Sequence, residues 1–404
     1  MKVHLHGILQ HKSALAISCL FNLSLVCQPV INAQFSESDF IHYTVREGLS
    51  DNNVSGIAQD DQGYIWIGTD AGLSRFDGHQ FTNFYQSTPP LQLLSGSIER
   101  LENIGPQQLG INTRGGFQLL NTKSYEVRNF IIPDSTAFYT YLNATWQTVA
   151  LDDGSYAITT AAGFYVFDAS GNLTLRHDVY DIQDIGQRRI LYGRDIFNIG
   201  KGQYLIYFNE KGMALYDHNI RKYTELDPRD TTWHIFAHPN VHPTDHWVLK
   251  QQLNPEEFIF IPNTSQTIVY YHHGLKRRVE SPITPEIHYA FNWASKVAVL
   301  HDTTLIINCR TKGFYLFHLN RTTGHISYDV TKYLPEYEIL YPFVDKDNRI
   351  WAGTTQGILQ QKLKPPFIHA YRYPPARGET YTGGFTTLYK YKNRLYAGRF
   401  SRNK

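Results

Sequence analysis

The stretch GYIWIGTDAGLSRFDG at residues 63–78 decides the fold, because altered copies of it recur along the chain. The clearest copy is RIWAGTTQGI at residues 349–358. One glycine opens the second apolar run of each copy and serves as a ruler. It occurs at Gly72, Gly116, Gly163, Gly212, Gly313 and Gly357, at spacings of 44, 47, 49, 101 and 44 residues. A nearly constant period of this length indicates a tandem array of one small structural unit.

Each unit has the pattern of four short strands. In the first unit the strands are predicted at residues 54–59, 64–69, 73–76 and 81–85. The segments between them are rich in Asp and Gly, which favour tight hairpin turns. Four strands with their turns need about 40 residues, the length of a propeller blade. The sequence therefore predicts an all-β fold, a β-propeller of four-stranded antiparallel blades.

The spacing also gives the number of blades. The step of 101 residues is close to two periods, so one unit near residues 233–272 has lost its glycine. Two of its strands are predicted at residues 258–261 and 267–271. This makes seven units, and an eighth begins at residues 394–398, where RLYAG repeats the pattern of RIWAG.

The chain ends soon after the eighth unit begins, and two readings of this are open. We expect a seven-bladed propeller at residues 34–365 and the truncated start of a second propeller at residues 366–404, so that the chain is the front part of a longer receptor. Residues 40–45 would then close the first ring as the outer strand of its last blade, which leaves no unpaired edge. Residues 367–373 resemble that strand and would close the second ring. The alternative is one eight-bladed ring with an incomplete last blade.

Composition and charge exclude some classes of function. The chain is 42% hydrophobic and 14% aromatic, which suits a packed β-sheet protein. Its formal net charge is only +2, which argues against a nucleic-acid partner. The sequence contains no glycine loop of the kinds that bind nucleotides, and no cofactor is predicted.

The N-terminus has the layout of a secretory signal peptide. Two lysines precede an apolar run, and a short polar stretch ends near Ala33. We expect residues 1–33 to be cleaved off after export; an uncleaved anchor, a buried strand and a lipoprotein signal are less favoured alternatives. Cys19 and Cys27 would leave with the peptide, so Cys309 would have no partner for an internal disulfide.

The first unit resembles the two-component regulator propeller repeat. The matching residues are FIHYT at 40–44, EGLSDNNV at 47–54, GYIWIGT at 63–69 and FDG at 76–78. The resemblance extends more weakly over residues 40–401. It implies the periplasmic sensor of a hybrid two-component histidine kinase of the Bacteroidetes type. Such sensors have two seven-bladed propellers and an immunoglobulin-like domain before the membrane helix and the kinase. They commonly detect oligosaccharides and work as dimers.

Most residue clusters that suggest chemistry have simpler interpretations. Four histidines recur at steps of four between residues 234 and 246, but Pro239 and Pro243 would break the helix that could align them on a metal. No metal site is predicted. The Asp-rich segments 60–63 and 345–348 are interpreted as hairpin turns rather than calcium loops.

Candidate ligand-binding residues are few and weakly supported. Trp66 and Trp351 occupy equivalent strand positions and are expected to pack between blades. The remaining tryptophans, Trp146, Trp233, Trp247 and Trp293, could stack on sugar rings. The basic run at residues 272–278 could hold an acidic sugar, although a solvated loop is the simpler interpretation. The candidates chosen are Trp233, Trp247, His272 and Arg277, and no catalytic residue is predicted.

These observations predict a periplasmic sensor module that binds a small carbohydrate and signals to a histidine kinase outside this chain. The module itself would not be an enzyme. The full receptor would be a homodimer anchored in the inner membrane by a downstream segment. The alternatives are a secreted propeller enzyme, such as a polysaccharide lyase or glycosidase, and a protein-interaction scaffold.

Overall fold

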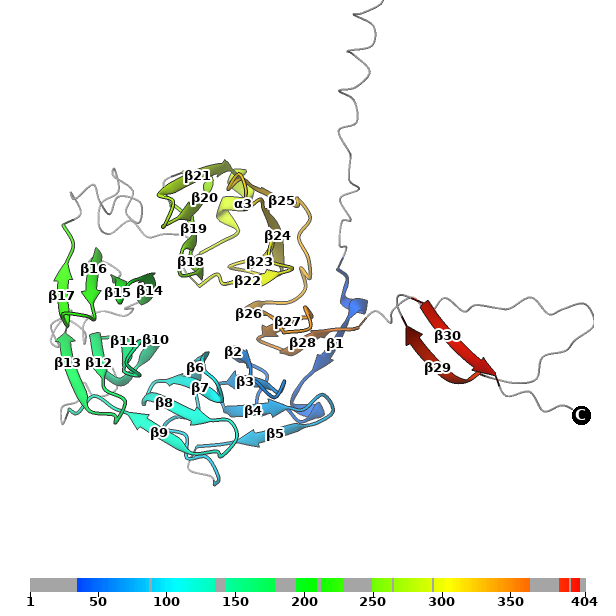
Figure 1. The fold of residues 1–404 in the computed structure, drawn as a ribbon, viewed down its shortest axis with the longest axis horizontal. Helices are drawn as coiled ribbons and strands as arrows, with labels where there is room; N and C mark the ends of the chain where they lie inside the picture. The colour runs from blue at the N-terminus through cyan, green and yellow to red at the C-terminus, as the bar shows by residue number, and fades with distance from the viewer. Residues whose placement is uncertain are drawn as a thin grey trace, which may run out of the picture. The chain divides into compact units, whose positions relative to one another are not determined.

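The computed structural model describes residues 35–86, 89–134, 142–178, 194–208, 212–227, 249–263, 265–292, 294–363, 385–391 and 394–399. Within residues 35–362, seven four-stranded antiparallel sheets are arranged in a ring (Figure 1). The predicted β-propeller is therefore confirmed, and the ring has seven blades rather than eight.

The blades follow one another along the chain. Blade 1 contains β2 (Val54–Gln59), β3 (Ile65–Thr69), β4 (Gly72–Phe76) and β5 (Phe81–Phe84). Blade 2 contains β6 (Ile98–Gly105), β7 (Gln108–Thr113), β8 (Gly116–Asn121) and β9 (Val127–Phe130). Blade 3 contains β10 (Thr145–Ala150), β11 (Tyr156–Thr160), β12 (Gly163–Phe167) and β13 (Leu173–Asp178). Blade 4 contains β14 (Arg194–Gly200), β15 (Gln203–Phe208), β16 (Gly212–Asp217) and β17 (Lys222–Glu225).

The last three blades complete the circle. Blade 5 contains β18 (Leu249–Asn254), β19 (Glu257–Ile261), β20 (Thr267–His272) and β21 (Arg277–Pro282). Blade 6 contains β22 (Val297–Leu300), β23 (Thr304–Asn308), β24 (Phe314–Leu319) and β25 (Ile326–Tyr328). Blade 7 contains β26 (Ile339–Val344), β27 (Ile350–Thr354), β28 (Gly357–Gln361) and β1 (Phe40–Tyr43). The helices whose full length is described are short: η1 (Glu37–Asp39), η2 (Val45–Glu47) and α3 (Pro285–Tyr289), which begins after the N-cap Thr284.

The ring is closed by its N-terminal strand. β1 pairs antiparallel with β28, from Phe40 opposite Gln361 to Tyr43 opposite Ile358. The predicted role of residues 40–45 as the closing outer strand is confirmed. The paired residues lie about 320 positions apart in the sequence. The pairing covers the edge of β28 that blade 7 would otherwise expose.

The glycines used as a ruler mark a tight contact inside each blade. Gly72 and Gly357 open the third strands of blades 1 and 7 with φ of +123° and +121°. A Cβ atom on Gly72 would lie 2.5 Å from the carbonyl oxygen of Phe84, and one on Gly357 would lie 2.3 Å from that of Tyr43. Both the backbone angle and the contact with the fourth strand therefore require glycine. Blade 5, predicted to lack this glycine, still forms β19 and β20 where its strands were expected.

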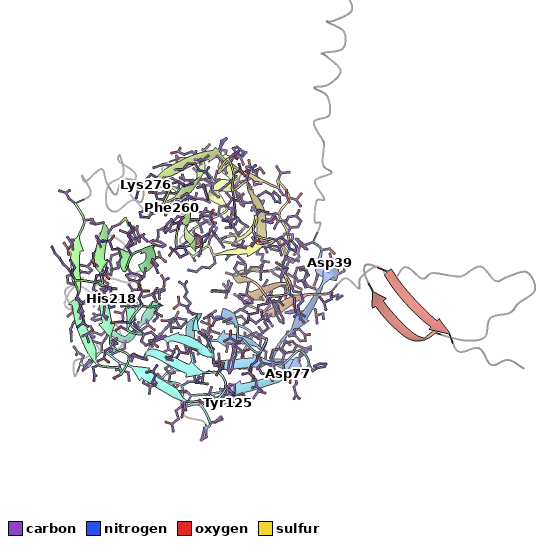
Figure 2. The ribbon with its side chains drawn as sticks, in the orientation of Figure 1. Asp39, Asp77, Tyr125, His218, Phe260 and Lys276 are labelled. Atoms are coloured by element: carbon purple, nitrogen blue, oxygen red, sulfur yellow. The ribbon has the colours of Figure 1, made fainter. Side chains whose placement is uncertain are left out.

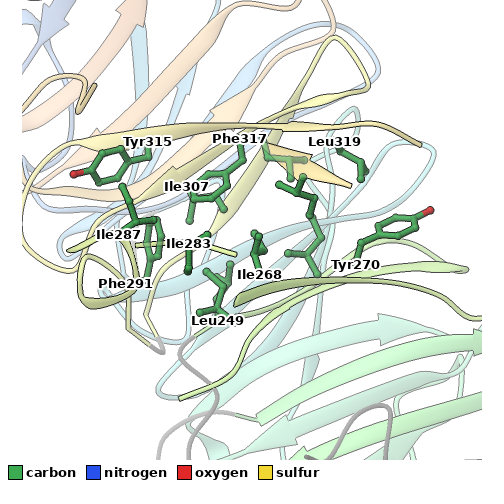
Figure 3. Close-up of a cluster of buried hydrophobic side chains, with 14 of the residues drawn as sticks. Leu249, Ile268, Tyr270, Ile283, Ile287, Phe291, Ile307, Tyr315, Phe317 and Leu319 are labelled. Atoms are coloured by element: carbon green, nitrogen blue, oxygen red, sulfur yellow. The ribbon is translucent and has the colours of Figure 1, made fainter. Parts of the chain in front are cut away.

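Apolar side chains fill the space between neighbouring blades. Between blades 5 and 6, for example, Ile268 and Tyr270 pack with Ile307 and Phe317 (Figure 3). Each blade thus buries its faces against its neighbours, and the core is distributed around the ring.

Trp66 and Trp351 belong to these packed layers. Both are buried, and each indole Nε1–H donates to a turn carboxylate of its own blade: Asp60 at 2.8 Å and Asp345 at 2.9 Å. The other carboxylate oxygen of each Asp accepts two backbone N–H bonds within its turn. The predicted packing role of the tryptophans and the predicted turns are confirmed.

Residues 363–404 form a second unit, in which β29 (Phe385–Tyr391) and β30 (Arg394–Arg399) pair as an antiparallel hairpin. The assignment of residues 366–404 to a second propeller stays a prediction. The predicted signal peptide (1–33) and second closing strand (367–373) lie outside the described residues. In the part of the chain that the structure describes, no helix has the length and apolar character needed to cross a membrane.

Candidate functional site in the central channel

The first strand of every blade faces the centre of the ring (Figure 1). A group of ionisable side chains from five of the blades lines cavities there, and we call it the channel cluster. It comprises Arg100 and Glu102 on β6, Asp195 on β14, Lys250 on β18, Lys296 just before β22, and Tyr341 on β26. The members influence one another across the ring; Arg100, for example, interacts electrostatically with both Asp195 and Tyr341.

One pair in the channel cluster is built on β6. Arg100 Nε lies 3.0 Å from Glu102 Oε1. The other oxygen of Glu102 accepts bonds from Asn112 Nδ2 at 3.0 Å and from the backbone N–H of Thr148 at 2.9 Å. Burial raises the pKa of Glu102, and the charge of Arg100 opposes that rise. This carboxylate is therefore held by blades 2 and 3 together.

A second pair joins blades 4 and 5. Lys250 Nζ lies 2.7 Å from Asp195 Oδ2 and 3.9 Å from the centre of the Tyr207 ring. Burial by itself would raise the pKa of Asp195, but the attraction of Lys250, Lys296 and Arg100 is stronger and lowers it. Asp195 is thus an ionised carboxylate whose charge is balanced mainly by Lys250.

Two glutamines fix the strand that carries Asp195. The side chain of Gln147 on β10 bonds both backbone groups of Ile196, with Oε1 accepting at 2.8 Å and Nε2 donating at 3.3 Å. From the other side, Gln252 on β18 bonds both backbone groups of Asn198, at 3.0 and 2.6 Å. The inner strands of blades 3, 4 and 5 are therefore tied together by amide bridges.

Lys296 differs from the other two cations of the channel cluster. Within the described residues, no carboxylate or hydrogen-bond acceptor lies in contact with its ammonium group. The side chain is half-buried in the lining of the channel, and the partial desolvation lowers the pKa of Lys296 to about 8, assisted by repulsion from Arg100 and Lys250. Because three cations face two carboxylates, the channel cluster carries one positive charge in excess.

Two cavities lie beside these groups. The smaller, of about 300 Å³, is lined mainly by polar side chains, among them Arg100, Lys250 and Lys296. The larger, of about 690 Å³, is mainly apolar and includes Leu101, Val149 and Phe343, together with Glu102 and Tyr341. Both volumes fall in the range of small-molecule sites.

Of the predicted ligand residues, His272 and Arg277 do not belong to the channel cluster. His272 and Arg277 face each other across the β20–β21 hairpin of blade 5, whose Lys276 lies at the edge of the ring (Figure 2). His272 Nε2 lies 3.5 Å from Glu256, and the Arg277 guanidinium donates to two backbone carbonyls of blade 6 at 2.8 and 2.9 Å. Trp233 and Trp247 lie outside the described residues, as does the histidine run between 234 and 246. The described residues show no group of three or more His, Cys, Asp or Glu placed to hold a metal.

Sequence reasoning missed the channel cluster, although a weak signal was present. Arg100, Asp195 and Lys250 each stand at the second or third position of a first strand, and Lys296 directly precedes one. An alignment of the units would have shown that charged residues recur near the start of the first strand.

Comparison with known proteins then identifies the repeat. The description of the two-component regulator propeller matches residues 48–71. Residues 48–71 are thus similar to a two-component regulator propeller repeat. The match covers the start of blade 1, the unit whose sequence is most regular.

One curated relative and several solved structures resemble this chain. Histidine kinase P4 of Formosa agariphila is 42% identical over 59 residues, which is 15% of this chain and 4% of that protein. The extracellular domain of a hybrid two-component system from B. thetaiotaomicron superposes with a TM-score of 0.57 at 18% identity, covering 89% of this chain and 46% of that one. A streptogramin B lyase superposes with a TM-score of 0.54 at 12% identity, covering 80% and 95%.

The low identities and the partial coverage limit what these similarities show. At identities of 18% and 12% the superpositions establish a shared fold only. The chain spans less than half of the extracellular domain that it matches and a small fraction of the histidine kinase.

Proposed function

We propose that this chain is the extracytoplasmic, ligand-binding part of a two-component signalling receptor. The match of residues 48–71 to the two-component regulator propeller carries this proposal, and the local identity to a histidine kinase supports it. The solved neighbours with this fold include extracellular domains of two-component systems. The channel, whose cavities have the size of small-molecule sites, also supports the proposal.

The proposed receptor would be exported by residues 1–33, dimerise, and be anchored in the inner membrane by a segment beyond residue 404. Residues 366–404 would begin a second ring. The ligand would be an oligosaccharide, and a downstream histidine kinase would receive the signal. Ligand can drive such a switch only by binding one arrangement of the receptor more tightly than the other.

The test is a binding screen on the purified chain. Calorimetry against a panel of neutral and acidic oligosaccharides should find saturable binding of at least one, without cleavage of the sugar. Hydrolysis or elimination of a bound glycan would contradict the sensor proposal, and so would a failure to bind any oligosaccharide.

A secreted enzyme is the second candidate function, and Lys296 is the observation that favours it. An amine with a pKa near 8 could serve as the general base of a polysaccharide lyase. The test is the ultraviolet absorbance of an unsaturated product when the chain is incubated with polyuronides. The sensor proposal predicts no increase.

A protein-interaction scaffold has less support from the described surface. Its large exposed apolar side chains come from different blades, such as Ile220 on the β16–β17 turn, Leu275 on the β20–β21 turn and Val330 after β25. A scaffold would more often present one contiguous apolar patch.

A further inference from the structure

The basic hairpin of blade 5 is the obvious place in the sequence for an acidic ligand, but three of its basic side chains are already engaged. Arg277 is committed to carbonyls of blade 6, and Arg278 Nη2 lies 2.7 Å from Glu280. His272 lies near Glu256. A ligand at this hairpin would have to displace these contacts, so an anion site is better sought elsewhere in the ring.

The channel cluster offers a cation, Lys296, that has no ion-paired or hydrogen-bonded partner among the described residues. We propose that the sugar bound by this ring carries a carboxylate, and that this carboxylate binds in the central channel against the Lys296 ammonium. The inference rests on the proposed sensor function and adds the chemical class of its ligand, a uronic-acid sugar, and the place where it binds.

Lys296 is the cation of the channel cluster whose charge is not balanced by a paired carboxylate. Arg100 is paired with Glu102 and Lys250 with Asp195, so the excess positive charge of the channel cluster falls on Lys296. One carboxylate would neutralise this excess and supply the missing acceptor. Charge-assisted hydrogen bonds of this kind are stronger than neutral ones, and more so away from bulk water.

The two cavities beside the channel cluster differ in the polarity of their linings. Arg100 and Gln147 line the polar cavity, and the next residue on each strand, Leu101 and Thr148, lines the larger apolar cavity. Both cavities therefore border β6 and β10. A uronate sugar has the same two-sided character, with a charged group at one end and a C–H face that can contact apolar side chains such as Phe343.

The groups around Lys296 are held in place by contacts within the ring. The paired cations are fixed by their own carboxylates, and β14 is held on both sides by Gln147 and Gln252. The site is therefore formed before the ligand arrives, which lowers the entropic cost of binding.

Binding should depend on pH through Lys296. The charged groups that act on its ammonium are Arg100 and Lys250, which repel it, and Asp195 and Glu102, which attract it. Since the pKa of Lys296 is about 8 in the protein without ligand, affinity for a carboxylate should be highest below pH 8 and fall as the pH rises above it.

The experiment compares D-galacturonate with D-galactose, which differ by a carboxylate in place of a CH₂OH group. Calorimetry at pH 7 on the intact chain should show binding of galacturonate in preference to galactose. Lys296→Gln should weaken galacturonate binding about 10- to 100-fold, the range expected for a hydrogen bond to a charged group. The matched control is Lys123→Gln, which removes an exposed lysine of the β8–β9 turn and should leave the affinity unchanged. Thermal melting of each variant confirms that it is folded.

The outcomes separate this inference from the proposed function. Equal binding of the two sugars, or an unchanged affinity in Lys296→Gln, overturns the channel site. If a neutral oligosaccharide binds while galacturonate and acidic oligosaccharides do not, the carboxylate inference fails and the sensor function stands. If no oligosaccharide of either kind binds, the carboxylate inference and the proposed sensor function both fail.

Discussion

Two regions of this protein concentrate positive charge, and they are built in opposite ways. The β20–β21 hairpin of blade 5 gathers His272, Lys276, Arg277 and Arg278 within seven residues. The channel cluster gathers Arg100, Lys250 and Lys296 from three blades, almost 200 residues apart. In the hairpin, His272, Arg277 and Arg278 find partners nearby or on the next blade, whereas Lys296 in the channel has no paired carboxylate among the described residues.

The difference shows what closing the ring adds. Residues on one hairpin can find their partners locally, so a dense run of charge is more often a self-contained surface feature. Residues on seven inner strands meet only when β1 completes blade 7. The excess charge created in this way is partly shielded from bulk water, which strengthens its effect on a ligand.

The largest effect should come from removing a carboxylate of the channel. Glu102→Ala leaves the Arg100 guanidinium without its ion pair inside the ring. We expect a loss of about 3–5 kcal/mol in the free energy of unfolding. Denaturant titration followed by tryptophan fluorescence measures it.

The matched change in the hairpin is Glu280→Ala, which removes the partner of Arg278 at a site where the Glu280 side chain is 47% exposed. This surface pair should contribute about 1 kcal/mol or less. Equal losses in the two variants would show that the channel is no more shielded than the surface.

The next effect concerns Lys296 and has a definite sign. Its folded pKa is lowered from 10.5 to about 8, so between these values the unfolded chain binds more protons than the folded one. Stability attributable to Lys296 should therefore rise with pH over this window. Below pH 8 the partly desolvated charge destabilises the fold, and Lys296→Met should be more stable than the wild type by about 2 kcal/mol, after allowance for screening by channel solvent.

Denaturant midpoints of the two proteins between pH 7 and 10.5 test this difference. The advantage of Lys296→Met should shrink steadily above pH 8. A gap that stays constant with pH would mean that Lys296 titrates normally and is not held in the channel.

A smaller effect is expected in the hairpin. Arg277 joins blade 5 to two carbonyls of blade 6 and lies 5.6 Å from the centre of the Tyr270 ring. Arg277→Ala should reduce stability by about 1–2 kcal/mol, yet leave galacturonate affinity unchanged. Arg277→Lys is the control that keeps the charge but not the forked geometry. A loss of binding in both variants would place the ligand at the hairpin.

The smallest effect should follow from His272→Ala. Its imidazole lies 3.5 Å from Glu256, a side chain that is 62% exposed. Thermal melting should show a change within about 0.5 kcal/mol, and calorimetry should show the same affinity for galacturonate. A substantial loss of affinity would restore the original prediction for this residue.

The sequence predicted the ring well because its determinants are local. β2 was predicted to the residue at 54–59, and the ruler glycines mark third strands because a backbone carbonyl lies too close for any Cβ. Trp66 and its turn Asp60 lie six residues apart, so their pairing is also encoded within one hairpin.

The site was harder to predict because its determinants are distant. Nothing in the residues around Lys250 or Lys296 indicates that their side chains meet Arg100, since that contact depends on the curvature of the whole ring. His272 and Arg277 were chosen for their charge alone, and the sequence could not show that their partners lie nearby. Trp233 and Trp247 stay predictions.

A crystal structure of the chain with D-galacturonate bound tests the channel site most directly. We predict density for the sugar in the central channel, with a carboxylate oxygen about 3 Å from Lys296 Nζ. Density at the blade 5 hairpin, or a sugar elsewhere in the ring with Lys296 uncontacted, would contradict the proposed site.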